Sequence, residues 1–248
     1  MKSLDPDWII PDWPAPANVR AFITTRAGGA SQGPYASLNL GLRTDDDARA
    51  VATNRDRLRA AVPQEPKWLR QVHGNTVVEA DPLADMPEAD AAVARRPGTV
   101  CAVLVADCVP VLLADRDGTT VAVAHAGWRG LASGVLENTI ERMARPPEGL
   151  LAYLGPGIGP QAFEVGADVR DAFLARDSRS ATAFAPRAPG KWLADLFMLA
   201  RQRLDRIGIT NVYGGSHCTF SDPQRFFSYR RERTTGRMAA VIWMKHDE

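Results

Sequence analysis

The sequence predicts a single mixed α/β (α+β) domain in which helices cover a central arrangement of strands, and three observations lead to this fold class. Its 248 residues suffice for one substantial hydrophobic core without requiring a second. Short strand-like runs alternate with helical ones, and no repeat or low-complexity linker separates them. Several strand-like runs are apolar at consecutive positions, which is typical of strands buried on both faces. We therefore treat residues 1–248 as one layered domain.

The predicted strands are segments rich in β-branched and apolar residues that are bounded by turn-forming residues. They are 20–25, 67–72, 76–80, 99–106, 109–114, 120–125, 150–154, 211–213 and 238–243. Cys101 falls in the middle of one of these buried-strand patterns, so we expect it to be a core residue.

Four helices are predicted from apolar residues at helical spacing. The first begins at Thr44, because the segment Thr-Asp-Asp-Asp has the form of a capping box with acidic residues in the first turn. The second carries its apolar stripe over 131–143 and the third over 165–173. The fourth and clearest spans 191–207, and Gly208 is expected to end it.

Composition excludes several classes of partner. Lysine and arginine number 30 against 29 acidic residues, and no basic block marks a nucleic-acid footprint. The first twenty residues lack the apolar run of a signal peptide, and no run reaches the roughly eighteen apolar residues of a membrane-spanning helix. Three cysteines do not make a closed disulfide framework in a chain of this length. We expect a cytoplasmic protein with reduced thiols and a small-molecule partner.

Chemistry-bearing residues gather at the ends of predicted strands. His73 lies in RQVHGN, Cys108 in ADCVP, and His125 in AVAHAGWRG. A rigid sheet holds such positions in place while their side chains stay accessible. The three residues fit a zinc site with one position open for water or substrate, or a Cys108 nucleophile with His125 as its base. They also fit a purely structural role, and their spacing matches no compact metal motif.

The other polar candidates near these segments are weaker. His217 and Cys218 are adjacent, and neighbours on an extended chain point to opposite faces, so we expect packing or a substrate contact from them. His246 is expected to be solvated. Asp107 is a weak candidate for orienting a ligand or moving a proton, since it and its neighbour in the chain would also point apart.

Four arginines beside turns or histidines are candidates for holding phosphate through paired donors. They are Arg26, Arg70, Arg129 and Arg230. A surface salt bridge is the alternative role for each. Arg26 and Arg129 are favoured because neighbouring glycines allow the backbone to approach a ligand closely.

Six segments together resemble those of a known family. TTRAGGASQGPYASLNLG (24–41), RQVHG (70–74), ADCVPVLLAD (106–115), HAGWRG (125–130), GPGIGPQAFEVG (155–166) and FFSYRRERTTGR (226–237) occur in this order in the YfiH or laccase-domain family, also called peptidoglycan editing factor or multicopper polyphenol oxidase-like. Residues 1–19 form an N-terminal extension outside the resemblance. The resemblance implies an α-β-β-α layered sandwich similar to the catalytic domains of bacterial deamidating toxins.

The resemblance also implies a set of site residues. It assigns zinc, with copper as a substitute, to His73, Cys108 and His125, which then also form the catalytic group. Asn39 and Gln71 lie within the matching segments and join the four arginines as expected substrate contacts. The helix expected after the GWRG turn would present N-terminal amides to an anion.

The function implied by the resemblance is phosphorolysis of purine nucleosides such as adenosine, inosine and methylthioadenosine, with adenosine deamination beside it. Purine nucleoside and phosphate are then the partners, and the protein is a monomer or homodimer. One alternative is a cysteine amidohydrolase that edits miscoupled peptidoglycan precursors. The other is a copper-dependent polyphenol oxidase, but one blue-copper centre takes two histidines and a cysteine, and the chain has only four histidines.

Overall fold

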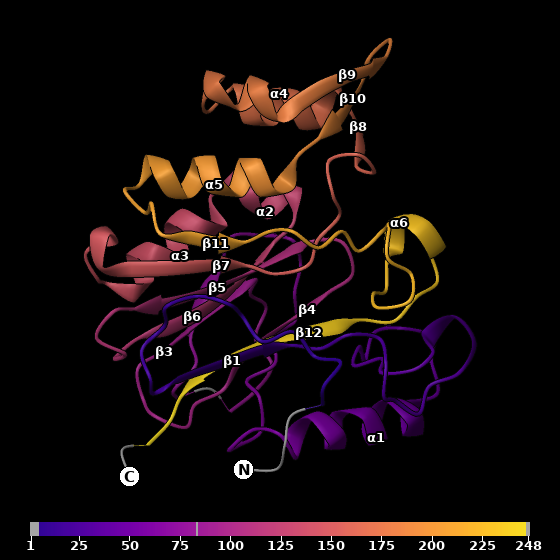
Figure 1. The fold of residues 1–248 in the computed structure, drawn as a ribbon, viewed down its shortest axis with the longest axis vertical. Coiled ribbons are helices and arrows are strands. Elements are labelled where there is room, and N and C mark those ends of the chain that lie inside the picture. The colour runs from indigo at the N-terminus through magenta and orange to yellow at the C-terminus, as the bar shows by residue number, and fades with distance from the viewer. Residues whose placement is uncertain (1–4, 83, 247–248) are drawn as a thin grey trace.

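The computed structural model describes residues 5–82 and 84–246, and it confirms the predicted layered fold. Helices, a six-stranded sheet, a three-stranded sheet and a last helix follow one another through the molecule (Figure 1). A further small sheet, packed with one helix, stands above the helical layer in the same view. The arrangement is an α-β-β-α sandwich.

The strands form three separate sheets. The six-stranded sheet has the order β11-β7-β5-β6-β3-β2, the three-stranded sheet has the order β1-β12-β4, and the small sheet has the order β8-β10-β9. The bounds are β1 (Val19–Ile23), β2 (Val77–Glu79), β3 (Ala91–Ala94), β4 (Cys101–Val105), β5 (Val109–Asp115), β6 (Val121–Ala126), β7 (Leu150–Leu154), β8 (Glu164–Gly166), β9 (Phe184–Ala188), β10 (Lys191–Ala194), β11 (Val212–Gly214) and β12 (Met238–Met244).

The helices cover the two outer faces of the paired sheets. Their bounds are α1 (Ala48–Arg59), α2 (Trp128–Ser133), α3 (Val135–Met143), α4 (Ala167–Leu174), α5 (Leu196–Arg206) and α6 (Tyr229–Glu232), with short 3₁₀ turns at Gly33–Tyr35, Pro147–Gly149 and Ser178–Ala183. Helices α2, α3 and α5 lie over the six-stranded sheet, and α1 lies beyond the three-stranded sheet (Figure 1). None of the helices in the described ranges is long and apolar enough to cross a membrane.

The core explains why consecutive residues of the central strands are apolar. In β5, Val111 and Leu113 pack into the cluster shared with the helices. Leu112 and Ala114 point the other way and pack against the three-stranded sheet. Each fully buried leucine or valine contributes roughly 1.5–3 kcal/mol relative to an exposed one. Burial on both faces, as the sequence predicts, thus stabilises the sandwich and makes β5 a rigid support.

One predicted strand, 67–72, is wrong. This segment makes only isolated bridges, which join Lys67 to Cys101 and Arg70 to Glu88. Here the side chain of Gln71 makes the hydrogen bonds to the Leu104 backbone that a neighbouring strand would otherwise make. The Gln71 amide donates to the backbone oxygen of Leu104 and accepts from its backbone nitrogen, at 2.8 Å in each case.

Helix starts were the other source of error. The carboxylate of Asp47, and not the hydroxyl of Thr44, accepts hydrogen bonds from the first turn of α1. The predicted helix at 191–207 begins with a strand, β10, and the Asp195 carboxylate then accepts from the Met198 nitrogen to begin α5. The apolar stripe at 165–173 likewise starts in strand β8. Aromatic and branched residues at these positions fit a strand as well as a helix.

Besides β8 and β10, two further strands, β3 and β9, were missed, and one predicted helix is broken. Three of the four residues of β3 are alanine, and β9 contains a proline, so neither has a strand-like composition. The predicted helix over 131–143 divides into α2 and α3 at Gly134, whose φ is +99°. Gly208, with a φ of +87°, follows the end of α5 as predicted.

We predict that Gly134→Ala destabilises the protein because the left-handed backbone costs a residue with a Cβ about 1–2 kcal/mol. Nothing at Gly134 crowds a Cβ closer than 3.6 Å, so the effect isolates the backbone strain. Gly149→Ala is the matched control, since no atom lies within 4 Å of its Cβ position. Urea unfolding measures both, and equal stability of the two variants would contradict the prediction.

Candidate metal centre

The three predicted ligands meet at one end of the sheets. Cys108 stands directly before β5, His125 lies in β6, and His73 lies in the loop that leads into β2. The antiparallel pairing of Pro110 with His125 brings the first two together. One ligand atom from each of the three residues lies within 4.8 Å of the others. His125 is buried, Cys108 is half-buried and His73 is exposed, so the group has an open side.

A single buried carboxylate, that of Asp90, organises this group. Its Oδ1 accepts from His125 Nδ1 at 2.8 Å and from the His73 backbone nitrogen at 3.0 Å. Its Oδ2 accepts from the backbone nitrogens of Gly74 at 2.7 Å and Val72 at 3.2 Å. Because Nδ1 of His125 faces Asp90, its Nε2 is left to face the cluster.

Asp90 is charged despite its burial. Burial raises the pKa of this carboxyl, but the hydrogen bond and charge of His125 and the backbone donors outweigh burial and lower the pKa overall. Asp90 was not among the predicted site residues. The only feature of the sequence that marks it is its position directly before the apolar strand β3, and an acidic residue at such a position more often lies in an exposed turn.

Two residues at the site hold backbone conformations that favour glycine. His73 has a φ of 61° and Asp107 a φ of 98°. Each costs about 1–2 kcal/mol relative to an ordinary conformation. Asp107 is held by its own carboxylate, which accepts from the Thr219 hydroxyl and the Arg230 backbone nitrogen at 2.6 Å each. Its neighbour Cys108 is thereby fixed in direction.

Gly127 leaves the space that the cluster needs. A Cβ at this position would lie 2.7 Å from Cys108 Sγ and 3.4 Å from His73 Cδ2. Only glycine therefore fits between β6 and the cluster. One sulfur and two imidazole nitrogens around such a space match the donors preferred by zinc and copper, so the residues fit a bound metal.

The electrostatics of the cluster favour a thiolate. Burial raises the pKa of the Cys108 thiol, but the charge of His125 and hydrogen bonds from His125 and His73 outweigh it and lower that pKa to about 6. Burial lowers the pKa of His125, but the Cys108 charge and the hydrogen bond to Asp90 raise it to about 9. The thiolate is the form of cysteine that binds metals and attacks electrophiles.

Three of the predicted substrate contacts serve to hold loops. Asn39 is buried and its Oδ1 accepts from the backbone nitrogens of Gly41 and Arg237 at 3.0 and 2.9 Å. Gln71 is bonded to Leu104, as described above. Arg26 donates to the Ala36 carbonyl oxygen at 2.9 Å and pairs with Glu232 at 3.4 Å.

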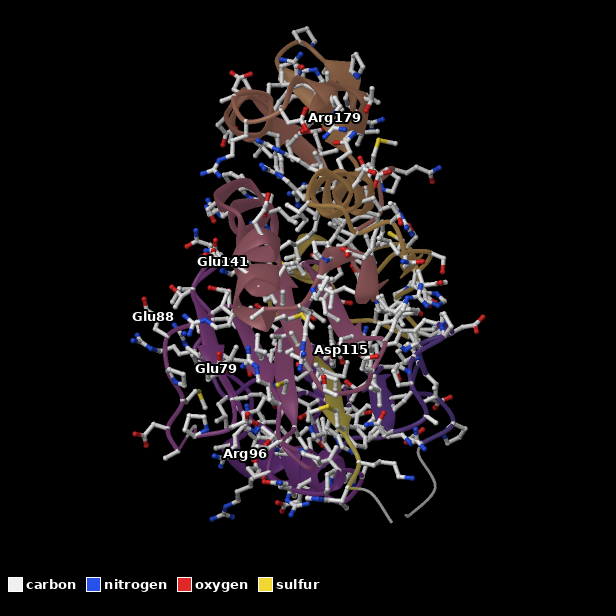
Figure 2. The ribbon with its side chains drawn as sticks, turned by 90° about the vertical axis from the view of Figure 1, so that its left-hand side faces the viewer. Glu79, Glu88, Arg96, Asp115, Glu141 and Arg179 are labelled. Carbon is white, nitrogen blue, oxygen red and sulfur yellow. The ribbon has the colours of Figure 1, made fainter. Side chains whose placement is uncertain are left out.

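Arg70 pairs with Glu88 at 2.6 Å, and both side chains are more than half exposed. Glu88 lies at the outer edge of the molecule and points away from the ribbon (Figure 2). A substrate role for Arg70, like those of Arg26, Asn39 and Gln71, stays a prediction.

The two remaining arginines belong to segments next to the cluster, since Arg129 follows Gly127 by two residues and the backbone nitrogen of Arg230 donates to Asp107. Arg129 is exposed, and its guanidinium stacks over the Trp128 ring at 4.4 Å in the first turn of α2. Arg230 is half-buried, and its guanidinium donates to the Glu164 carbonyl oxygen at 2.7 Å. Their contact with phosphate or substrate stays a prediction.

The other histidines and cysteines do not join the group. Cys218 Sγ accepts from the Gly159 nitrogen at 3.2 Å, and the His217 ring packs near that of Phe226. Cys101 is fully buried and His246 is exposed, as predicted. Over the described ranges, His73, Cys108 and His125 form the single group of three or more residues suited to a metal.

Residues 20–245 match the family described as multi-copper polyphenol oxidoreductase laccase. The chain belongs to this laccase-domain family. Its membership confirms the resemblance seen in the sequence and implies metal binding.

Relatives of this laccase-domain chain carry the name purine nucleoside phosphorylase. The one from Pseudomonas aeruginosa is 56% identical over 239 residues, which cover 96% of this chain and 98% of the relative. Purine nucleoside phosphorylase YfiH of Escherichia coli K12 is 52% identical, with 95% and 98% covered.

Solved structures of the laccase-domain family share the fold. A Neisseria meningitidis protein superposes with a TM-score of 0.94 at 52% identity, covering 97% of this chain and all of the other. YlmD from Geobacillus stearothermophilus superposes with a TM-score of 0.87 at 31% identity, covering 96% of each chain.

We predict that Asp90→Asn weakens zinc binding by about 10-fold to 100-fold, because an amide cannot satisfy all four donors or fix the His125 tautomer. Asp115→Asn is the control. Asp115 is likewise buried and accepts two backbone hydrogen bonds at 2.7 and 2.9 Å, but it is the last residue of β5, at the opposite end of the strand from Cys108. Chelator competition gives both affinities, and wild-type affinity in Asp90→Asn would refute the assignment.

Proposed function

We propose that this chain is a zinc-dependent purine nucleoside phosphorylase acting on adenosine, inosine and methylthioadenosine, with adenosine deaminase activity at the same site. The observation that carries the proposal is the convergence of one cysteine and two histidine ligand atoms within 4.8 Å, beside the space left by Gly127. The names of the relatives supply the substrate class. A cytoplasmic location and a monomeric or homodimeric state stay predictions.

Phosphorolysis exchanges one bond for another. The bond from the ribose C1′ to the purine nitrogen breaks, a bond from C1′ to a phosphate oxygen forms, and the purine nitrogen takes a proton. Deamination of adenosine instead takes up water and releases ammonia. A bound zinc ion supplies a Lewis acid for such steps.

The chain's own residues prepare this chemistry. His73, Cys108 and His125 would hold the metal. Asp90 keeps the proton of His125 on Nδ1 and so keeps its Nε2 directed at the cluster. The exposed side of His73 leaves an approach for a small molecule.

A multicopper oxidase is disfavoured despite the family's description. The cluster offers the ligands of one copper centre, and the remaining histidines, His217 and His246, lie outside it. Copper binds such donors more tightly than zinc does. Polyphenol oxidation by this chain would therefore report copper that has replaced zinc at one site.

A cysteine amidohydrolase is the second candidate, and a specific arrangement favours it. Cys108, His125 and Asp90 stand in the order of nucleophile, base and orienting carboxylate. The low pKa of the Cys108 thiol, about 6, suits a nucleophile. A metal would occupy the same thiolate, so amide cleavage of a peptidoglycan precursor and metal-dependent chemistry compete for this residue.

We predict that the purified protein binds about one zinc ion per chain and that His73→Ala, Cys108→Ala and His125→Ala each lose it, because three ligands leave no redundancy. Cys218→Ala is the matched cysteine control and keeps the metal. Elemental analysis after dialysis measures the content. Full zinc retention in all three ligand variants would overturn the site.

We predict that the zinc-loaded protein releases adenine from adenosine only when inorganic phosphate is present, with ribose 1-phosphate as the second product. Removal of zinc by a chelator abolishes the reaction, and added zinc restores it. Inosine formation needs no phosphate and continues without it. If metal removal instead switches on amide cleavage, and alkylation of Cys108 switches it off, the amidohydrolase is correct.

A further inference from the structure

A fifth arginine, Arg237, stands at the same end of the sheets as the metal centre. It directly precedes β12, whose first residue, Met238, pairs with Val105 at the end of β4. The chain runs from Val105 through Asp107 to Cys108, so the register brings Arg237 alongside this turn. Its own backbone nitrogen is held by Asn39 Oδ1 at 2.9 Å.

The guanidinium of Arg237 makes no ion pair within the part of the chain that the structure describes. The side chain is half-buried, and its Nη1 donates to the carbonyl oxygens of Thr235 and Gly236 at 2.9 Å each. The nearby Arg26 and Arg231, by contrast, both pair with Glu232. A half-buried unpaired cation is costly unless an anion neutralises it.

The surroundings of Arg237 are those of the site. Burial lowers the pKa of its guanidinium, and the charges of Cys108 and Asp107 raise that pKa by less than burial lowers it. Its guanidinium also lies 5.9 Å from the centre of the Tyr229 ring. Tyr229 is 48% exposed and begins α6, which closes this end of the layers (Figure 1).

Neither Asp107 nor Cys108 accepts a hydrogen bond from the Arg237 guanidinium in the described residues. Both carboxylate oxygens of Asp107 are taken, one by the Thr219 hydroxyl and one by the Arg230 nitrogen. Cys108 belongs to the metal cluster. The Nε and Nη2 donors of Arg237 carry no hydrogen bond to the described residues and are not shut off from solvent. A planar fork of this kind matches two oxygens of one phosphate.

We propose that Arg237 binds the anionic co-substrate beside Cys108, namely inorganic phosphate or the phosphate of the sugar product. The proposal rests on the proposed phosphorylase function and names the residue that holds its second substrate. Arg237 differs from Arg129, the candidate that the sequence favoured, because the guanidinium of Arg129 is exposed and stacks over the Trp128 ring.

The test compares Arg237→Gln and Arg237→Lys with Arg233→Gln in zinc-loaded protein. Arg233 is the matched control because it lies over the same Tyr229 ring, at 5.8 Å, but is exposed. We expect kcat/KM for phosphate to fall by roughly 10-fold to 150-fold in Arg237→Gln, the effect of one charge-assisted hydrogen bond. In Arg237→Lys, which keeps the charge but lacks the planar pair of donors, kcat/KM for phosphate falls less. The rate of adenosine deamination by the Arg237 variants changes by about twofold or less, and so does the activity of Arg233→Gln.

A second readout does not require turnover. Inorganic phosphate should raise the thermal unfolding temperature of the wild type and of Arg233→Gln, but not that of Arg237→Gln. Zinc content and circular dichroism establish that the variants are folded, and Arg237→Lys replaces Arg237→Gln if the latter is not.

The two readouts separate the inference from the proposed function. If the wild type cleaves no nucleoside with phosphate, yet phosphate stabilises it through Arg237, the proposed function is wrong and the anion site is supported. A wild type that phosphorolyses, with unchanged phosphate dependence in both Arg237 variants, overturns the role of Arg237. Loss of phosphate dependence in Arg129→Gln alone would transfer that role to Arg129. Absence of both phosphorolysis and phosphate-induced stabilisation overturns both proposals.

Discussion

Four hydrogen-bond donors converge on the carboxylate of Asp90, which no solvent reaches. A buried carboxylate is tolerated only when its charge is compensated, and here the donors are the residues that must be positioned. Three backbone N–H groups fix the loop of His73, and the fourth donor is the ring of His125. The desolvation cost of one charge is therefore offset by the contacts that bring two candidate ligands from distant segments to one place.

The second half of the site depends on Asp107 in a similar way. Its left-handed backbone turns the chain at the end of β4, and its two oxygens hold the segment that carries Thr219 and Arg230. From α6 the chain continues to Arg237, which directly precedes β12. Because Met238 at the start of β12 pairs with Val105, Arg237 lies near the end of β4. Two strained turns, each stabilised by a carboxylate, thus shape this end of the sheets, and the second of them carries the chain from β4 to Cys108 beside the start of β12, which Arg237 directly precedes.

The sequence indicated the layers and the three candidate ligands more directly than the residues that support them. Buried strands such as β5 are recognisable because both of their faces are apolar, and His73, Cys108 and His125 are rare residue types, the last two of them at the ends of such strands. Asp90 and Arg237 belong to common charged types, and nothing in their local pattern distinguishes them from surface residues. Their roles arise from the pairing of β3 with β6 and of β12 with β4. Such long-range register is not encoded in any single segment, and the same holds for the bridge from Gln71 to Leu104.

The geometry also bears on whether Cys108 is a ligand or a nucleophile. A cysteine nucleophile needs a base and an orienting carboxylate, which His125 and Asp90 supply, and it does not require a second histidine. His73 nevertheless occupies a left-handed conformation that costs free energy, and two further donors to Asp90 flank it to maintain that conformation. Gly127 likewise keeps open a space beside both Cys108 and His73 that a proton transfer does not require. A third ligand and room for an ion account for both features, so these local costs favour the metal over the nucleophile.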